Sequence, residues 1–299
     1  MAEPFDFPHP IFVGGVGRSG THPMGHLVAA DPRYTWVRTE TRFHASSGGL
    51  PDLYRDETTM SEFLAQMRGR WWKRGHRQHQ GLQRIIDRED FDAALAAFER
   101  DYEADRVAAS RRLVKALLDP SAERKGTPAW VEITGEVVEE APFLLELFPR
   151  AKFINMVRDG RAVVAGTLRK ADLTDDPMRA LHKWRDMVQA AADAIADVPA
   201  DRVLTIFLDD FTAFDREGTF ERLVEFLELD DPAPMRVYFD NEISSERAHV
   251  GKWRERMAPQ DARMIDRRYR RLVKRMHRKG IEWAPEPRPE ERAPKLLGR

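Results

Sequence analysis

Cysteine is absent from all 299 residues of the sequence. Disulfide bonds, thiolate metal sites, iron–sulfur clusters and cysteine nucleophiles are therefore excluded. Long apolar runs are also absent, whereas a membrane-spanning helix needs about 20 such residues. The first residues, MAEPFDFPHP, lack the basic start and apolar stretch of a signal peptide. These absences predict a soluble, cytoplasmic protein without a transmembrane segment.

The chain has no overall excess of charge of one sign. It contains 49 basic and 50 acidic residues, and this balance argues against bulk binding of nucleic acid. The distribution is uneven, because residues 236–299 hold 18 Lys and Arg against 10 Asp and Glu. This excess indicates an anionic ligand nearby. Nucleic-acid binding through this stretch is the alternative, and its signature would be a strong dependence on salt.

The sequence has the composition of a folded domain. Hydrophobic residues make up 42% of the chain, which excludes disorder of the whole chain. The length suits one large domain or two small ones. We expect a single domain over residues 1–283 and a poorly ordered tail over residues 284–299, where proline and charge dominate.

Short apolar runs alternate with helical patterns along the chain. The strands are expected at residues 11–16, 34–38, 130–134, 152–157 and 203–208. Helices are expected after the glycine cluster near residue 20, over much of 59–118, and at residues 143–148, 160–170, 177–196, 219–228 and 262–279. This alternation predicts an α/β fold with a central parallel sheet flanked by helices.

A glycine-rich loop, GVGRSGTH at residues 15–22, follows the first expected strand. Its backbone N–H groups and the N-terminus of the next helix form an anion site, with a plain tight turn as the alternative. A nucleoside triphosphatase loop would end in lysine and then serine or threonine. Here Thr21 and His22 hold those positions, and the cation is Arg18. The loop therefore suits a phosphate whose transfer chemistry needs no metal.

Four segments, in this order, resemble landmarks of sulfotransferases that use 3′-phosphoadenosine 5′-phosphosulfate (PAPS). RSGT at 18–21 resembles the 5′-phosphosulfate loop, and LFPRAKFINMVRDGRAVV at 147–164 is similar to the second signature of the family. Residues 203–229 resemble the later strand, acidic turn and helix. VGKWRERM at 250–257 resembles the segment that folds over the nucleotide. The resemblance implies a P-loop-like sulfotransferase fold. It also implies metal-independent transfer of a sulfuryl group from PAPS to a hydroxyl or amine of a small molecule, lipid or glycan.

The resemblance also implies which residues hold PAPS. In the loop they are Gly17, Arg18, Ser19, Gly20, Thr21 and His22. Arg158 is expected to bind the 3′-phosphate, with a surface ion pair to Asp159 or Glu136 as the alternative. In the C-terminal segment the expected cofactor residues are Arg247, Gly251, Lys252 and Trp253, with core packing as the alternative for Trp253.

Several positions depart from the family pattern. Gly160 replaces a proline, and Gly166 replaces the serine that binds the 3′-phosphate. Thr167 is the candidate substitute, although one residue along a helix turns a side chain by about 100°. Ile133 replaces a lysine near the leaving group, so Arg18 would carry more of this catalytic role. These departures leave open a catalytically inactive PAPS-binding protein. A P-loop kinase or nucleotidase is the other alternative.

The general base is expected in RTETRF at residues 38–43. Glu40, Thr41 and Arg42 resemble the Glu-Thr-Arg of tyrosylprotein sulfotransferases, whose glutamate is the catalytic base. Arg42 would keep Glu40 ionised, as a base requires. A surface ladder with Arg38 is the structural alternative. The cytosolic branch of the family uses a histidine as base, and the replacements here would be His44, His76 and His79.

Helical residues 59–128 lie between the donor motifs and are expected to form the acceptor side. Four aromatic residues there are candidates for an apolar pocket, with core packing as the alternative: Trp71, Trp72, Phe98 and Tyr102. We expect Arg161 to be a solvated helix residue. The arginine-rich helix at residues 262–279 is expected to present a solvated face.

Overall fold

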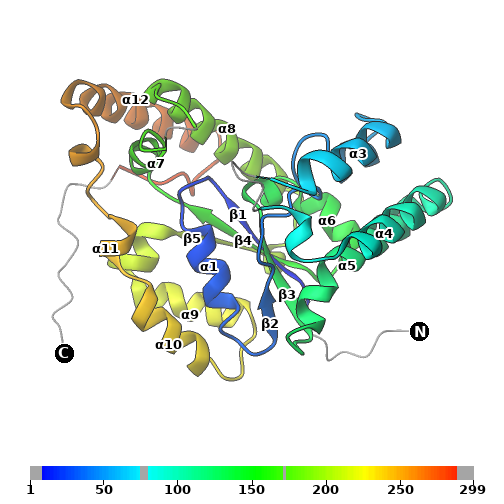
Figure 1. The fold of residues 1–299 in the computed structure, drawn as a ribbon. Helices are drawn as coiled ribbons and strands as arrows, with labels where there is room; N and C mark the ends of the chain where they lie inside the picture. Colours follow the sequence, from blue (N-terminus) through cyan, green and yellow to red (C-terminus); the bar gives the residue numbers. More distant parts are fainter. Residues whose placement is uncertain (1–8, 75–79, 171–172, 288–299) are drawn as a thin grey trace.

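The computed structural model describes residues 9–74, 80–170 and 173–287. Five parallel strands form one sheet (Figure 1), so the predicted α/β fold is confirmed. In sheet order the strands are β2 (Tyr34–Trp36), β3 (Ala129–Ile133), β1 (Ile11–Gly15), β4 (Lys152–Val157) and β5 (Val203–Phe207).

Helices cover both faces of the sheet because side chains alternate between the faces along each strand. Ile11 and Val13 of β1 join the core beneath one set of helices, whereas Phe12 between them packs on Phe153 at the opposite face. The first set is α1 (Thr21–Val28), α9 (Arg216–Phe226) and α10 (Ala233–Glu242). The second is α4 (Arg88–Asp101), α5 (Arg106–Glu123), α6 (Ala141–Leu147) and, in part, α8 (Pro177–Ile195).

A third core lies where α8 meets α7 (Gly160–Thr167) and the long C-terminal helix α12 (Pro259–Arg278). Figure 1 shows these helices on the opposite side of the molecule from α3 (Met60–Gln66) and α4. The apolar face of α12 is buried and its arginines are exposed, as expected. The remaining α-helices of the described residues are α2 (Leu50–Tyr54) and α11 (Ser245–Ala248).

The end of β1 sets the geometry of the loop that follows. Gly15 has φ +117, and a Cβ there would lie 2.1 Å from the carbonyl oxygen of Met156 on β4. Only glycine allows β1 to turn so close to its neighbouring strand. Because the strands are parallel, the loop after β1 lies at the same edge as the residues that follow β4 and β5. This edge is where the candidate residues gather.

The boundary that we expected for the C-terminal tail, at residue 284, lies too early in the sequence. Ala284 is buried, and its carbonyl oxygen lies 2.7 Å from Nε2 of His277. The hydroxyl of Tyr269 donates a hydrogen bond to the carbonyl oxygen of Pro285 at 2.6 Å. These contacts attach residues 284 and 285 to α12. The rest of the expected tail, from residue 288, lies outside the described residues.

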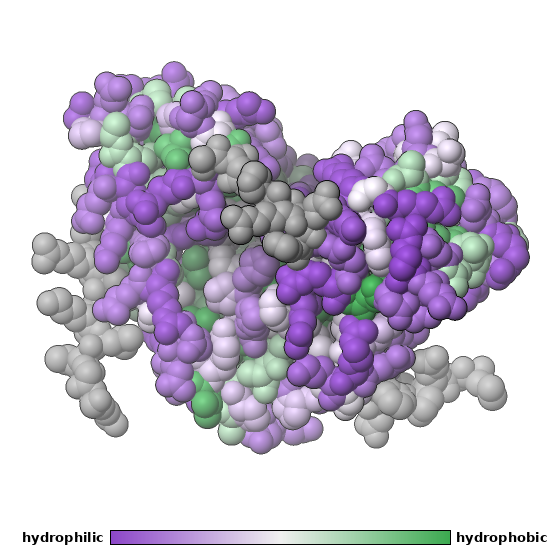
Figure 2. Space-filling model, in the orientation of Figure 1, coloured by the Kyte–Doolittle hydropathy of each residue, from purple (hydrophilic) through white to green (hydrophobic). Residues whose placement is uncertain are grey.

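Within the described ranges, no helix combines the length and the apolar character needed to cross a membrane. Figure 2 shows hydrophobic residues as scattered spots on a mostly hydrophilic face. The large hydrophobic side chains that are exposed, Leu173, Phe214 and Val237, come from three separate segments. Among the described residues, the face in view therefore shows no extended apolar patch of the kind that marks a docking site.

Candidate active site

The loop between β1 and α1 is held in a strained conformation. Arg18 has φ 71 and Gly20 has φ 86, both left-handed. A non-glycine residue such as Arg18 adopts this conformation at a cost that functional sites commonly carry. No side chain caps the N-terminus of α1, so the first N–H groups of this helix are available to a ligand.

Ser19 supplies the clearest sign of a ligand-binding site in this loop. Its side chain is fully buried, and its Oγ has no hydrogen-bond partner among the described residues. Burying an unpaired hydroxyl costs about 1 to 3 kcal/mol, so a ligand oxygen is the natural partner. Gly17 has no neighbouring atom within 4 Å of an added Cβ, which leaves one side of the loop open. These features fit a phosphate group.

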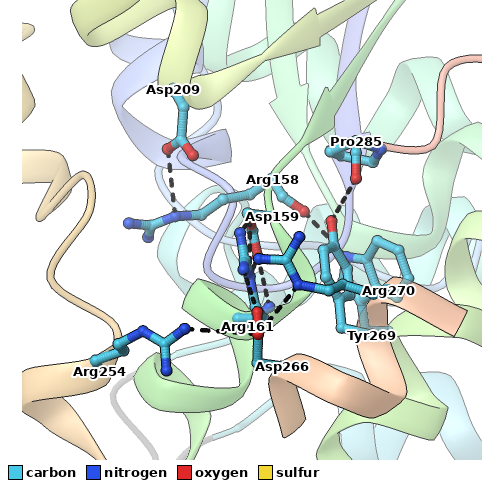
Figure 3. A network of polar contacts seen from close by, with 10 residues as sticks. Arg158, Asp159, Arg161, Asp209, Arg254, Asp266, Tyr269, Arg270 and Pro285 are labelled. Carbon is cyan, nitrogen blue, oxygen red and sulfur yellow. Dashed lines mark hydrogen bonds and ion pairs between the residues drawn. The ribbon is translucent and has the colours of Figure 1, made fainter. Parts of the chain in front are cut away.

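Arg158, the first residue after β4, lies beneath this loop. Its Nη1 donates to the carbonyl oxygen of Arg18 at 3.1 Å, and its Nη2 donates to that of Ala248. Its Nε lies 3.8 Å from Oδ1 of Asp209 (Figure 3). Arg158 is only 8% exposed, and burial lowers its pKa. The alternative of a surface ion pair with Asp159 or Glu136 is therefore wrong.

Further cations from distant segments gather around Arg158 and the loop. Burial and the nearby charges of Arg169 and Arg18 lower the pKa of Arg256. Burial also lowers the pKa of His249, which is further depressed by Arg256, Arg158, Lys252 and Arg169. We call Arg18, Arg158, Arg169, Lys252 and Arg256 the cationic cluster. Like charges repel, so a shared anion would stabilise this arrangement.

Three members of this region were not found from the sequence: Arg169, His249 and Arg256. One sequence signal was the basic excess over residues 236–299, which does not separate His249 from the solvated arginines of α12. Arg256 also lies within VGKWRERM at 250–257, the segment that resembles the nucleotide cover of the family, but it was not singled out there.

The two glycines of α7 that depart from the family pattern have different surroundings. A Cβ on Gly160 would lie 2.7 Å from a ring carbon of Tyr269 and 2.9 Å from one of Trp184. These buried rings exclude a proline. Gly166 lies against the Arg18 side chain, whereas Thr167 is the half-buried last residue of the helix. The role of Thr167 stays a prediction.

Arg161 is not the solvated residue that we expected. It is 2% exposed, and its guanidinium pairs with Asp159 at 2.7 Å and with Asp266 of α12. Its Cζ also lies 4.7 Å from the ring centroid of Trp253. Figure 3 shows how this network joins the start of α7 to α12. The network fixes the segment that carries Lys252 and Arg256 beside the loop.

The remaining C-terminal candidates have different surroundings. Trp253 is buried against Ala162 and Ala165, so the core-packing alternative describes it. Gly251 has φ 73, a left-handed conformation that favours glycine. Arg247 is exposed and pairs with Glu242.

Glu40 lies next to the phosphate loop through a contact that the sequence did not reveal. Its Oε1 lies 3.2 Å from Nε2 of His22 on α1, and its Oε2 accepts hydrogen bonds from Arg42 at 2.5 and 2.9 Å. Burial alone would raise the pKa of Glu40. The hydrogen bond from His22 and the charge of Arg42 outweigh burial and hold this pKa at about 2. Glu40 is therefore ionised. His22 links Glu40 to the phosphate loop, and the alternative of a surface ladder of charges with Arg38 does not account for this contact.

The histidine alternatives for the base are less suitable. His44 is fully buried, with Nε2 3.1 Å from Oε2 of Glu132, so it cannot reach an acceptor in this structure. His76 and His79 lie outside the described residues. Arg74, which the sequence did not single out, donates from Nη1 to the carbonyl oxygen of Glu40 at 2.8 Å.

The core-packing alternative describes the four aromatic candidates for an acceptor pocket. Trp71, Phe98 and Tyr102 are buried in the core, and Trp72 packs on Phe91 with ring centroids 4.5 Å apart. The position of the missing lysine is also apolar core. A Cβ on Gly25 of α1 would lie 2.3 Å from Cδ1 of Ile133, so Ile133 packs against this helix.

The family profile described as "Sulfotransferase family" matches residues 10–233. The chain belongs to the sulfotransferase family. The resemblance to sulfotransferases is thereby confirmed at the level of the family.

Two curated relatives of this sulfotransferase-family chain are protein-tyrosine sulfotransferases. It is 25% identical over 224 residues to the "Protein-tyrosine sulfotransferase" of Drosophila melanogaster, covering 73% of this chain and 38% of the relative. It is 26% identical over 225 residues to "Protein-tyrosine sulfotransferase A" of Caenorhabditis elegans, covering 73% and 50%. The chain therefore spans half or less of the length of these two relatives.

A solved structure with a similar fold is the sulfotransferase domain from the Synechococcus PCC 7002 olefin synthase. The TM-score is 0.53 at 19% sequence identity, over 90% of this chain and 97% of that domain. This likeness shows the sulfotransferase fold, as the sequence predicted.

Proposed function

We propose that this chain transfers a sulfuryl group from PAPS to a hydroxyl or amine acceptor on a small molecule, lipid or glycan. The observation that carries the proposal is the convergence at one sheet edge. The phosphate loop with the buried Ser19 hydroxyl meets the cationic cluster there, and ionised Glu40 is joined to the same loop by His22.

The residues present fit PAPS. The loop N–H groups, Ser19 and Thr21 would hold the 5′ side of the nucleotide, and Arg158 with Arg169 and Arg256 would hold the 3′-phosphate. PAPS supplies the activated sulfuryl group when it is bound. This group carries less charge than a γ-phosphoryl group, so N–H donors and a few cations suffice to stabilise the charge that develops on the leaving phosphate. Arg18, inside the loop, is the cation placed for this role.

Glu40 is proposed as the group that accepts the proton of the acceptor. Its low pKa keeps it charged but makes it a weak base while His22 and Arg42 both contact it. An acceptor hydroxyl that displaces one of these contacts would raise the pKa of Glu40 toward the range in which a general base works well. Before an acceptor binds, His22 and Arg42 thus keep Glu40 in its charged form.

The test has a binding arm and a turnover arm. The desulfated nucleotide, 3′-phosphoadenosine 5′-phosphate (PAP), is titrated calorimetrically with EDTA and with Mg²⁺, and ATP with Mg²⁺ is the control ligand. PAP binding that survives EDTA, together with weak ATP binding, is expected. Loss of PAP binding on chelation, or a preference for Mg–ATP, would favour a kinase or nucleotidase.

Turnover is followed as PAP release from PAPS with a panel of phenols, sugar alcohols, amines and a tyrosine-containing peptide. The peptide is included because curated relatives are protein-tyrosine sulfotransferases. Arg18→Gln is the matched variant, since it keeps the loop length and removes the cation. PAP binding without turnover on any acceptor class would favour the inactive PAPS-binding alternative.

A further inference from the structure

A fully buried carboxylate on β3 lies close behind the candidate base. Oε1 of Glu132 accepts three hydrogen bonds: from Thr41 N at 3.1 Å, Thr41 Oγ1 at 3.0 Å and Thr134 Oγ1 at 2.8 Å. Oε2 lies 3.1 Å from Nε2 of His44, which is equally buried. A charge at this depth is costly unless it is paired and hydrogen-bonded. The role proposed for Glu40 makes no use of this carboxylate.

The network continues from Glu132 to the backbone of Arg42. Thr134 Oγ1 accepts a hydrogen bond from Arg42 N at 3.3 Å and donates its own hydrogen to Glu132. One carboxylate oxygen therefore holds two successive main-chain N–H groups, that of Thr41 directly and that of Arg42 through a hydroxyl. This explains how Arg42 keeps φ 60, a left-handed conformation that a non-glycine residue holds only when its surroundings impose it.

The direction of the Glu40–Arg42 pair depends on this turn. Glu40 immediately precedes Thr41, and the Arg42 side chain folds back onto the Glu40 carboxylate. His44 also contacts this network, because its Nδ1 lies 3.1 Å from Thr41 Oγ1. The rings of Phe12 and Phe43 lie beside His44, with centroids 5.6 and 5.3 Å away. Aromatic packing therefore leaves this histidine little room to move.

We propose that Glu132, acting through Thr41 and Thr134, is a positioning residue that fixes Glu40 for proton transfer. The inference rests on the proposed function, because it assigns a task to Glu132 only if Glu40 is the base. Glu132 touches neither acceptor nor PAPS in this role. Its contribution is to hold the backbone turn in a conformation that the chain would otherwise leave.

The test cuts the link at Thr134, which leaves the buried carboxyl group of Glu132 and its contacts with Thr41 in place. Thr134→Val keeps the size of the side chain and removes the hydroxyl, whereas Thr134→Ser keeps the hydroxyl. Thr219→Val is the control, because Thr219 is a buried threonine on α9 whose hydroxyl bonds Asp215. Turnover at saturating PAPS is expected to fall about 10- to 100-fold in Thr134→Val, the scale of a small misplacement of a catalytic group. Thr134→Ser and Thr219→Val are expected to stay close to wild type.

Two further measurements separate positioning from general damage. The affinity for PAP is expected to be unchanged in Thr134→Val, and hydrogen exchange is expected to accelerate in the peptide that covers residues 40–46. Wild-type turnover with Thr134→Val would overturn the proposal. Equal impairment in Thr134→Ser, or a matching loss of PAP affinity, would do the same. If the wild type transfers no sulfuryl group, the proposed function fails. Exchange over residues 40–46 still tests the link in that case, because unchanged exchange would refute it.

Discussion

The side chain of Arg18 in the phosphate loop packs against Gly166 of α7. A Cβ at position 166 would lie 3.5 Å from Nε of Arg18 and 3.6 Å from its Cγ. The position that carries the phosphate-binding serine in the resembled family is thus in contact with the loop cation. The departure at this position leaves the geometry of the site intact and removes one hydroxyl from it.

Gly166→Ser is expected to be tolerated and to tighten nucleotide binding. The distances to Arg18 are ordinary contacts, and serine suits a helix better than glycine does. One added neutral hydrogen bond contributes about 0.5 to 1.5 kcal/mol, so the affinity for PAP should rise about 2- to 10-fold. Calorimetry with PAP and with adenosine 5′-phosphate, which lacks the 3′-phosphate, checks the effect. An unchanged ratio of the two affinities would refute it.

Gly160→Ala is the contrasting change in the same helix. An added Cβ would lie within 3 Å of the buried rings of Tyr269 and Trp184. Overpacking of this kind typically costs about 1 to 3 kcal/mol, so the free energy of unfolding should fall, as measured by urea denaturation. Gly166→Ser serves as the control. Wild-type stability of Gly160→Ala would mean that the rings move aside.

Arg256→Ala is expected to weaken binding of the 3′-phosphorylated nucleotide. A charge-assisted hydrogen bond contributes about 1.5 to 3 kcal/mol, so the affinity for PAP should fall about tenfold or more, with a smaller change for adenosine 5′-phosphate. The matched control is Arg267→Ala on the exposed face of α12. Equal losses of PAP affinity in the two variants would show that the effect comes from the general loss of one positive charge and not from a contact of Arg256 with the 3′-phosphate. Arg158→Ala should lose the same preference together with its buried contacts to Arg18 and Ala248.

Glu40→Gln is expected to abolish turnover while PAP binding stays near wild type. Glutamine keeps the size of the side chain and cannot take up the proton, and the loss of a general base typically costs about 10²- to 10⁴-fold in rate. The measurement is PAP release from PAPS with an accepted acceptor, and Glu57→Gln, an exposed acid paired with Arg55, is the control. Near-normal turnover would place the base elsewhere. Loss of PAP binding would make Glu40 a structural residue.

The pKa of Glu40 also predicts how its contribution to stability depends on pH. The folded-state pKa of about 2 lies below the ordinary value of 4.5. The contact therefore stabilises the folded state fully above about pH 4.5, and this stabilisation is lost as the pH falls toward 2. The difference in unfolding free energy between wild type and Glu40→Gln should shrink from pH 6 to pH 3 in urea titrations. A difference that grows on acidification would contradict the assignment.

Most of the fold could be predicted because its signals are local. All five residues of β1 are buried, so this strand of a parallel sheet is a continuous apolar run. The glycine loop follows it directly. The element bounds differ by a few residues, and α10 was missed because Pro232 and Pro234 lie at its start and it has no clear apolar stripe. The cytoplasmic location stays a prediction.

The candidate site could be predicted only in part, because its contacts join residues far apart in the sequence. Arg161 is buried by pairing with Asp266, and Thr41 is held by Glu132. Nothing near Arg161 or Thr41 in the sequence indicates these partners. The aromatic stripe containing Trp71 shows a different limit, since helical spacing reveals that a face is buried and does not say whether a ligand or another helix covers it.

Arg158 connects the phosphate loop to α11, since its guanidinium donates to the carbonyl groups of Arg18 and Ala248 at once. The phosphate site therefore draws on distant parts of the fold, and an N-terminal fragment that stops before residue 248 lacks one of the two contacts that hold Arg158. A ligand that binds only this assembled state shifts the folding equilibrium of the whole chain by mass action. Resistance to heat or protease at a given nucleotide concentration then reports on the integrity of the phosphate loop and α11 together.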